Sequence, residues 1–133
     1  MQKEIITIDG IKRPKSPFNH IVKAGDLLFL SSQLSCDLKT GDIIPGTIEQ
    51  QTRKALQNVK FLLESSGTSM DNVVRVTIFM KDANEFNKMD QVYREFFKVG
   101  YEPTRVTIQA LSPIEGITIE IEVIAVISAN LHD

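Results

Sequence analysis

Two charged side chains, Arg105 and Glu120, stand inside otherwise apolar runs of the sequence. Because a buried, unpaired charge costs several kcal/mol, each must be paired, hydrated or used in function. A guanidinium can bind a small carboxylate through two parallel hydrogen bonds, and a carboxylate held nearby can position or deprotonate a water molecule. The hydroxyl of Thr107 would add a polar group beside Arg105. The same two charges can instead form a structural cross-strand ion pair, and the residues alone leave both interpretations open.

Other arrangements of catalytic side chains are weaker in this sequence. Neither His20 nor His132 has a serine or cysteine partner at a recognisable spacing. Cys36, the single cysteine, lies near a turn and is more often a bystander than a reactive thiol. The sequence contains no glycine-rich phosphate-binding motif and no Cys/His spacing typical of a metal site, so we expect neither a cofactor nor a metal.

The composition is that of an ordinary folded domain. The chain has 133 residues, of which 42% are hydrophobic and 24% charged, with a net charge of −2. This size predicts one domain over residues 1–133, and the near-neutral charge argues against a general nucleic-acid-binding surface. Residues 1–11 lack the apolar segment of a signal peptide, and no apolar run approaches the roughly 20 residues of a membrane span. With a single cysteine as well, we expect a cytoplasmic protein outside the membrane.

Two segments have the apolar spacing of amphipathic helices. The first begins after Thr47, which forms a capping-box pair with Gln50, and ends before Gly67. The second is expected to begin at Asp82, with Glu85 three residues later, and to end before Gly100. Its apolar stripe is interpreted as a core contact without a ligand role; the stripe consists of Phe86, Met89, Tyr93, Phe96 and Phe97.

The remaining apolar runs have the character of β-strands. They are residues 3–8, 20–23, 27–31, 73–80, 104–110 and 117–127. Side chains alternate between the two faces of a strand. In the run 104–110 we expect Val106 and Ile108 to face the core, with Arg105 and Thr107 on the other side, and Glu120 to face away from the core as well. The three candidate site residues would then share one face.

The order of these elements predicts an α+β fold, in which two helices cover one face of a sheet of five or six strands. The second face also carries apolar side chains, because Val73, Phe79, Ile124 and Val126 are expected on the side opposite the helices. A mixed apolar and ionisable face is better buried against other copies of the chain than exposed to water. We therefore expect a homo-oligomer with polar pockets between its subunits.

Several motifs in their chain order resemble the RidA/YjgF family, also known as the L-PSP family. The resemblance extends from about residue 14 to residue 127, and its motifs are PF (17–18), SSQL (31–34), KTG (39–41), ALQNV (55–59), VVRVTIFMKD (73–82), YREFF (93–97), PTR (103–105) and IEIEVIA (119–125). The ordered set carries the resemblance, since no single motif is diagnostic. It implies a chorismate-mutase-like mixed β-sheet with two helices on one face, assembled as a homotrimer with clefts between subunits.

The resemblance also implies an activity and a set of site residues. Archetypal members hydrolyse enamine and imine intermediates of the 2-aminoacrylate type to 2-keto acids and ammonia, without a metal or cofactor. In such proteins the arginine at the position of Arg105 binds the substrate carboxylate, and the glutamate at the position of Glu120 orients the attacking water. The residue at the position of Thr107 lines the pocket. The implied partner is therefore a small 2-imino or 2-keto acid.

At two positions of the implied substrate pocket this sequence departs from the family pattern. Phe18 stands where many relatives have tyrosine, and Ser32 stands where a glycine is common. These departures motivate an alternative, in which the chain is a non-catalytic small-molecule-binding or regulatory trimer that uses the same cleft. A third hypothesis is an endoribonuclease or translation initiation inhibitor, and the net charge of −2 makes nucleic acid an unlikely partner.

Overall fold

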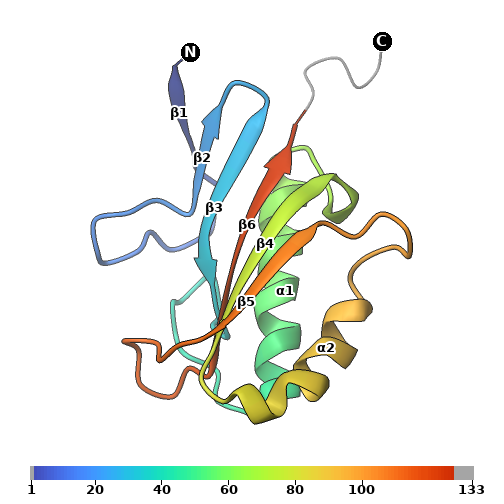
Figure 1. Cartoon of the computed structure of the whole chain (residues 1–133). Helices are drawn as coiled ribbons and strands as arrows, with labels where there is room; N and C mark the ends of the chain where they lie inside the picture. The colour runs from blue at the N-terminus through green and yellow to red at the C-terminus, as the bar shows by residue number, and fades with distance from the viewer. Residues whose placement is uncertain (1, 128–133) are drawn as a thin grey trace.

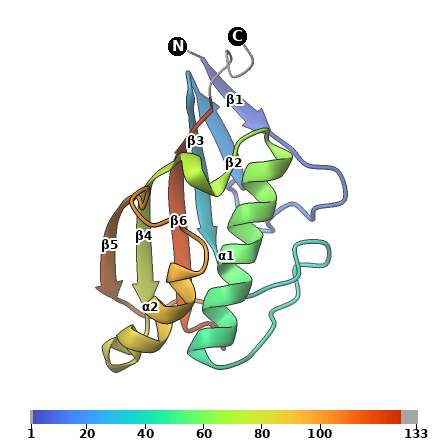
Figure 2. The ribbon, with the colours of Figure 1, turned by 90° about the vertical axis from the view of Figure 1, so that its right-hand side faces the viewer.

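The computed structural model describes residues 2–127, which form one mixed six-stranded sheet with both helices on one of its faces (Figures 1 and 2). The elements in chain order are β1 (Lys3–Ile6), β2 (Ile21–Ala24), β3 (Leu27–Gln33), α1 (Ile48–Ser65), the 3-10 turn η1 (Met70–Asn72), β4 (Val73–Met80), the 3-10 turn η2 (Ala83–Glu85), α2 (Phe86–Arg94), β5 (Thr104–Gln109) and β6 (Ile119–Val126). The strand order is β1-β2-β3-β6-β4-β5, and among the strands of the described residues only β4 and β5 pair in parallel. The expected α+β class is confirmed.

Helix α1 is held at both ends by the residues that the sequence indicated. The Thr47 side chain accepts a hydrogen bond from the Gln50 amide at 3.2 Å, and the Gln50 side chain accepts one from the Thr47 amide at 2.9 Å. Beyond the last turn, Gly67 adopts a φ of 93°, a left-handed conformation that glycine reaches without steric cost. The buried stripe of the helix, which includes Leu56 and Val59, packs against the sheet.

Helix α2 is shorter than the sequence predicted. The Asp82 side chain accepts a hydrogen bond from the Asn84 amide, and the Glu85 amide donates to the Asp82 carbonyl three residues back. This backbone bond closes a 3-10 turn, and the α-helix begins only at Phe86. At the other end, the amides of Glu95 and Phe96 bond to carbonyls three residues back. The chain then leaves the helix and runs to the edge strand β5 (Figure 2).

The two faces of β5 are reversed relative to our expectation. Residues in register on neighbouring strands share a face, and Arg105 pairs with the buried Val76 of β4, as Thr107 does with the buried Ile78. Arg105 and Thr107 therefore face the helices, whereas Val106 and Ile108 lie on the open face, 38% and 43% exposed. Alternation along an edge strand separates its two faces without indicating which one meets the core.

The open face of the sheet is partly apolar. Phe79, Ile124 and Val126 lie there as expected and are half-buried. Val73 does not, because a register shift between Val73 and Arg75 turns it toward the helices, where it is buried. Leu27 and Phe29 of β3 add further exposed apolar surface to this face. Among residues 2–127, no helix combines the length and apolar character needed to cross a bilayer.

A buried glutamine ties α1 to the loop that precedes β6. Gln51 is 1% exposed, and its amide nitrogen donates to the Gly116 carbonyl at 2.8 Å and the Gly46 carbonyl at 3.3 Å. Its side-chain oxygen accepts from the Thr118 amide at 3.0 Å. This side chain sets the entry of the chain into β6 and thereby the position of Glu120, two residues beyond Thr118.

We expect Gln51→Leu to lower the free energy of unfolding by about 2–4 kcal/mol, because leucine has a similar volume but makes none of the hydrogen bonds of Gln51 to Gly46, Gly116 and Thr118. Chemical denaturation measures the loss. Gln57→Leu on the exposed side of α1 is the matched control and should change stability by no more than about 0.5 kcal/mol. Equal stabilities of the two variants would contradict the bridging role of Gln51.

Candidate functional site

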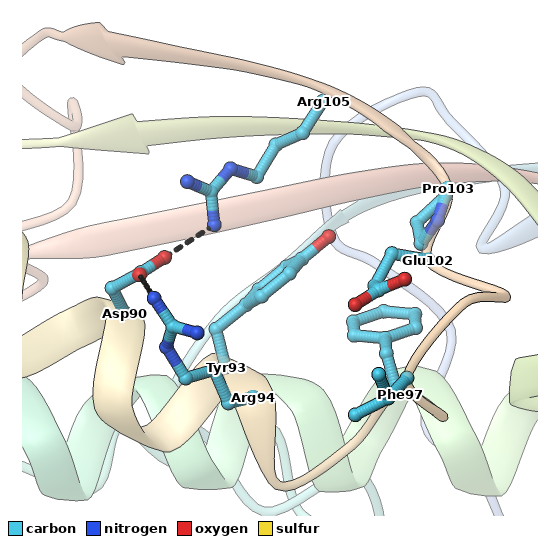
Figure 3. A pocket seen from close by; sticks show the side chains of 8 residues that line it. Asp90, Tyr93, Arg94, Phe97, Glu102, Pro103 and Arg105 are labelled. Carbon is cyan, nitrogen blue, oxygen red and sulfur yellow. Dashed lines mark hydrogen bonds and ion pairs between the residues drawn. The ribbon is translucent and has the colours of Figure 1, made fainter.

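Arg105 extends from the edge strand β5 toward α2 and is held there by charge and by aromatic rings (Figure 3). Its Nη1 donates to Asp90 Oδ1 at 2.6 Å. The guanidinium carbon lies 4.6 Å from the ring centroid of Tyr93 and 5.4 Å from that of Phe86, both within the range of cation–π attraction. The side chain is 25% exposed, so the guanidinium is held in one place yet remains open to a ligand.

A cavity of about 360 Å³ opens beside this guanidinium. Its walls come from α2, the segment that follows it and the beginning of β5 (Figure 3); the lining residues are Asp90, Tyr93, Arg94, Phe97, Val99, Glu102, Pro103 and Arg105. Two of them, Tyr93 and Phe97, belong to the helical stripe that the sequence analysis assigned to the core alone. They pack against each other with ring centroids 4.6 Å apart and also form a wall of the cavity.

Asp90 is held between two arginines. While Oδ1 accepts from Arg105, Oδ2 accepts from Arg94 Nη2 at 3.0 Å. Burial acts to raise the pKa of Asp90, but the hydrogen bond and charge of Arg105, with a contribution from Arg94, hold this pKa below its ordinary value. The carboxyl group is therefore an anion at neutral pH.

Two buried hydroxyl groups near Arg105 have no hydrogen-bond partner within residues 2–127. They belong to Tyr93, whose residue is 6% exposed, and to Thr107, which lies two positions beyond Arg105 on the same face of β5. Burial raises the pKa of Tyr93 to about 12, so its hydroxyl keeps its proton at neutral pH. The hydroxyl of Tyr93 can thus donate to a ligand as well as accept from one.

Glu120 lies on the other side of the sheet. It pairs with Phe79 on the open face, and its Oε2 accepts a hydrogen bond from Ser112 Oγ at 2.5 Å. Arg105 is in register with Val76 of β4 and Glu120 with Phe79, three residues further along β4 at about 3.3 Å per residue. Their strands, β5 and β6, lie on either side of β4, which adds two strand spacings of about 4.8 Å, and the two side chains point to opposite faces of the sheet. The expectation that Arg105, Thr107 and Glu120 share one face is therefore wrong within a single copy of the chain.

Phe18 and Ser32 line a second cavity of about 350 Å³. His20 and Cys36 also line it, and Ser32 stands where the pairing of β3 with β6 shifts register. Phe18 is 48% exposed and meets His20 edge to face, with ring centroids 6.5 Å apart. Neither Arg105 nor Glu120 lines this cavity, so one copy of the chain presents the candidate site residues in separate parts.

The remaining candidates contribute no separate chemistry. Burial raises the pKa of the Cys36 thiol, which disfavours the reactive thiolate. The His20 ring nitrogens lie 3.3 Å from the Lys12 carbonyl oxygen and 3.4 Å from Gln33 Nε2. His132 lies outside the described residues. Within residues 2–127 no group of three or more His, Cys, Asp or Glu side chains is placed to hold a metal ion.

Asp90 is the site residue that the sequence analysis missed. It lies four residues after Phe86 and three before Tyr93, so it is an acid within the apolar stripe of α2. An acidic residue at helical spacing among buried aromatic residues needs a partner, and this is the signal that points to it. The partner, Arg105, is 15 residues further along the chain.

Comparison with known proteins gives consistent similarities along the chain. Residues 10–127 match the family model described as Endoribonuclease L-PSP. A RutC family protein of Pyrococcus horikoshii is 41% identical over 92% of this chain and 97% of its own. A 2-iminobutanoate/2-iminopropanoate deaminase of Dermatophagoides farinae is 32% identical over 94% of this chain and 97% of its own. The crystal structure of E. coli TdcF with bound serine is 31% identical, with a TM-score of 0.82 over 94% of this chain and 99% of that chain.

The ion pair of Asp90 with Arg105 predicts a pH-dependent contribution to stability. Because the pKa of Asp90 is lowered on folding, its stabilisation is fully present above the ordinary pKa of about 3.9 and is lost as the pH falls through the lowered value. We expect Asp90→Asn to lower the free energy of unfolding by about 1–3 kcal/mol at pH 7. Denaturation at pH 3 to 8 should show this difference constant above pH 5 and shrinking below pH 4. A difference that grows on acidification would contradict the pairing.

Proposed function

The chain belongs to the RidA/YjgF family, also called the L-PSP family, and from this premise we propose that it is an imine deaminase that hydrolyses small 2-imino acids to 2-keto acids and ammonia. The observation that carries the proposal is the Arg105 guanidinium, which is held by Asp90 and two aromatic rings at the wall of a cavity of about 360 Å³. A planar guanidinium held in one orientation suits a small carboxylate.

The proposed reaction places modest demands on the protein. An enamine first tautomerises to the imine, and a water oxygen then forms a bond to C2 while the C=N double bond becomes a single bond. The resulting carbinolamine loses ammonia as its C–N bond breaks and the C2 carbonyl forms. Holding the substrate carboxylate and one water in place removes much of the entropic cost of this addition. A carboxylate that accepts and returns the proton of the water adds roughly 10²–10⁴-fold.

In the proposed site, Arg105 binds the substrate carboxylate and Glu120 orients the water, with Thr107 beside Arg105. Since these side chains face opposite sides of one sheet, the site requires Arg105 from one subunit and Glu120 from the next. The hydrogen bond from Ser112 holds the Glu120 carboxylate in a defined orientation. Phe18 and Ser32, which line the second cavity, would form a further wall of the same intersubunit cleft.

The partly apolar open face supports the assembly that this site needs. Apolar side chains of β3 and β5 on that face are between 38% and 43% exposed, which is unusual for a surface left in water; they are Leu27, Phe29, Val106 and Ile108. We propose that a homotrimer buries them and brings β5 of one subunit beside Glu120 of the next. Three copies joined in a ring by the same heterologous contact form three equivalent clefts between subunits.

The names of similar proteins support this chemistry at the level of substrate class. The relative from Dermatophagoides farinae is a 2-iminobutanoate/2-iminopropanoate deaminase, and TdcF carries serine in its crystal structure. Both names point to ligands with a carboxylate and a nitrogen on the neighbouring carbon. The family description as an endoribonuclease is not carried over, because a net charge of −2 gives little attraction for RNA.

The deaminase proposal predicts the effect of two substitutions on turnover. With 2-aminoacrylate generated enzymatically in the assay, we expect Arg105→Ala to reduce kcat/KM at least roughly 100-fold, through loss of the charge-assisted carboxylate contact. Glu120→Gln should reduce kcat by roughly 10²–10⁴-fold while leaving substrate binding nearly unchanged. Keto acid formation measures both effects. Wild-type protein that binds the ligand without accelerating its hydrolysis would contradict the proposal and support a non-catalytic binding trimer.

Sharing of the site between subunits predicts complementation. When Arg105→Ala and Glu120→Gln subunits are unfolded together and refolded at equal concentrations, about a quarter of the clefts receive one intact Arg105 and one intact Glu120. We expect about a quarter of the wild-type activity, whereas each variant refolded alone stays inactive. Sedimentation should show trimers throughout. A site contained in one subunit would leave the mixture as inactive as its components.

A further inference from the structure

The anion-binding group of the proposed site already holds an anion. Asp90 Oδ1 lies 2.6 Å from Arg105 Nη1, and the Asp90 side chain is only 16% exposed. A ligand carboxylate that approaches this guanidinium therefore meets a fixed negative charge beside its intended partner. A ligand carboxylate on the same guanidinium would stand close to Asp90, and two neighbouring carboxylates repel each other.

The second oxygen of Asp90 has a partner of its own. Oδ2 accepts from Arg94, four residues along the same helix, and that side chain is 77% exposed. When a ligand takes over Arg105, Asp90 keeps Arg94 as one partner and presents Oδ1 to the cavity. The structure thus provides a guanidinium and a fixed carboxylate oxygen side by side, one for each end of a dipolar ligand.

A wall of the cavity also contains a buried polar atom without a partner. Tyr93 lines the cavity and is 6% exposed, and its buried hydroxyl has no hydrogen-bond partner among residues 2–127. Figure 3 shows the hydroxyl at the far end of the ring from Asp90, on the side of Glu102 and Pro103. A buried hydroxyl without a partner is costly, so a rearrangement of this wall on ligand binding that gives the hydroxyl a partner would be favourable.

We propose that Asp90 is a specificity-determining residue, which makes the Arg105 site select ligands that carry a cationic N–H group next to their carboxylate over ligands that carry a carboxylate alone. This inference rests on the proposed function in placing the ligand carboxylate on Arg105. The ligand replaces the hydrogen bond between the two side chains, and Arg105 moves off Asp90 so that the ligand carboxylate binds Arg105 and the ligand N–H binds Asp90 Oδ1. Each charge of the internal pair then exchanges one partner of opposite sign for another.

The selection distinguishes substrate from product. A protonated 2-imino acid carries both the carboxylate and the cationic N–H group, whereas the 2-keto acid formed from it carries a carbonyl oxygen in place of the nitrogen. That oxygen cannot donate a hydrogen bond to Asp90, and the product anion leaves Asp90 Oδ1 without a positive partner. The product is therefore bound more weakly than the substrate and is released in favour of it.

Two stable probes of the same size test the selection without turnover. Alanine carries an ammonium group where pyruvate carries a carbonyl oxygen, and their affinities for the assembled protein can be measured by calorimetry or ligand-observed NMR. We expect the wild-type protein to bind alanine roughly 10- to 100-fold more tightly than pyruvate, the range of one hydrogen bond to a charged group. In Asp90→Asn the affinities for alanine and pyruvate should be equal, or pyruvate should bind more tightly. Propanoate should follow pyruvate.

Two further variants separate the local charge from other effects. Asp90→Glu retains the anion and should retain the preference for alanine, although the longer side chain weakens both affinities. Asp71→Asn makes the same chemical change in η1, outside the cavity lining, and should leave the preference as in the wild type. Circular dichroism establishes that Asp90→Asn is folded before its ligands are compared.

The outcomes of this experiment differ from those of the activity assay. Wild-type protein that binds pyruvate as tightly as alanine, or binds neither, would overturn the selection by Asp90. So would a preference that Asp90→Asn leaves unchanged. A protein that prefers alanine in an Asp90-dependent way but accelerates no imine hydrolysis would uphold the selection while overturning the deaminase proposal.

Discussion

Side chains in register across a β-sheet point to the same face, and this constraint governs where the chemistry of the protein can take place. Arg105 follows Val76 to the helix side, and Glu120 follows Phe79 to the open side. The backbone hydrogen bonds of three strands would have to be broken to bring the two side chains together. A site that uses both would therefore need an assembly of copies, and in the proposed trimer the half-exposed apolar side chains of the open face form the contact surface.

A guanidinium on the helix side of β5 lies beneath α2 and needs partners there that compensate its partial burial. Asp90 supplies the counter-charge, and the rings of Tyr93 and Phe86 supply cation–π contacts. These three contacts hold Arg105 in place without using all of its five N–H groups. The ion pair is thus a structural element, and in the proposed site it would bind a ligand as well.

The position of Glu120 depends on polar contacts with other segments of the chain. Gln51 anchors the residues before β6 to the first turn of α1, and Ser112 holds the carboxylate from the loop after β5. Each contact uses a buried or half-buried polar group whose partner is separated from it in the sequence by between 8 and 67 residues. The open-face half of the site therefore derives its geometry from the same helix that forms the core.

The sequence by itself determined the local elements. The capping box of Thr47 and Gln50, the left-handed Gly67 and the strand over residues 73–80 follow from short-range preferences, and they appear where expected. Its periodicity also determined that alternate residues of β5 share a face. Only the tertiary structure decided which face meets the helices, since β5 is an edge strand and its pairing with β4 alone orients it.

The same division holds for the candidate site. Arg105 and Glu120 were detectable as charges in apolar strands, because burial makes such residues need partners wherever they lie. Their separation, and the choice of Asp90 as the partner of Arg105, came from the packing of α2 against β5, which brings together residues that no local pattern connects. Backbone preferences act over a few residues, whereas the pairing of charges depends on which surfaces the folded chain buries together.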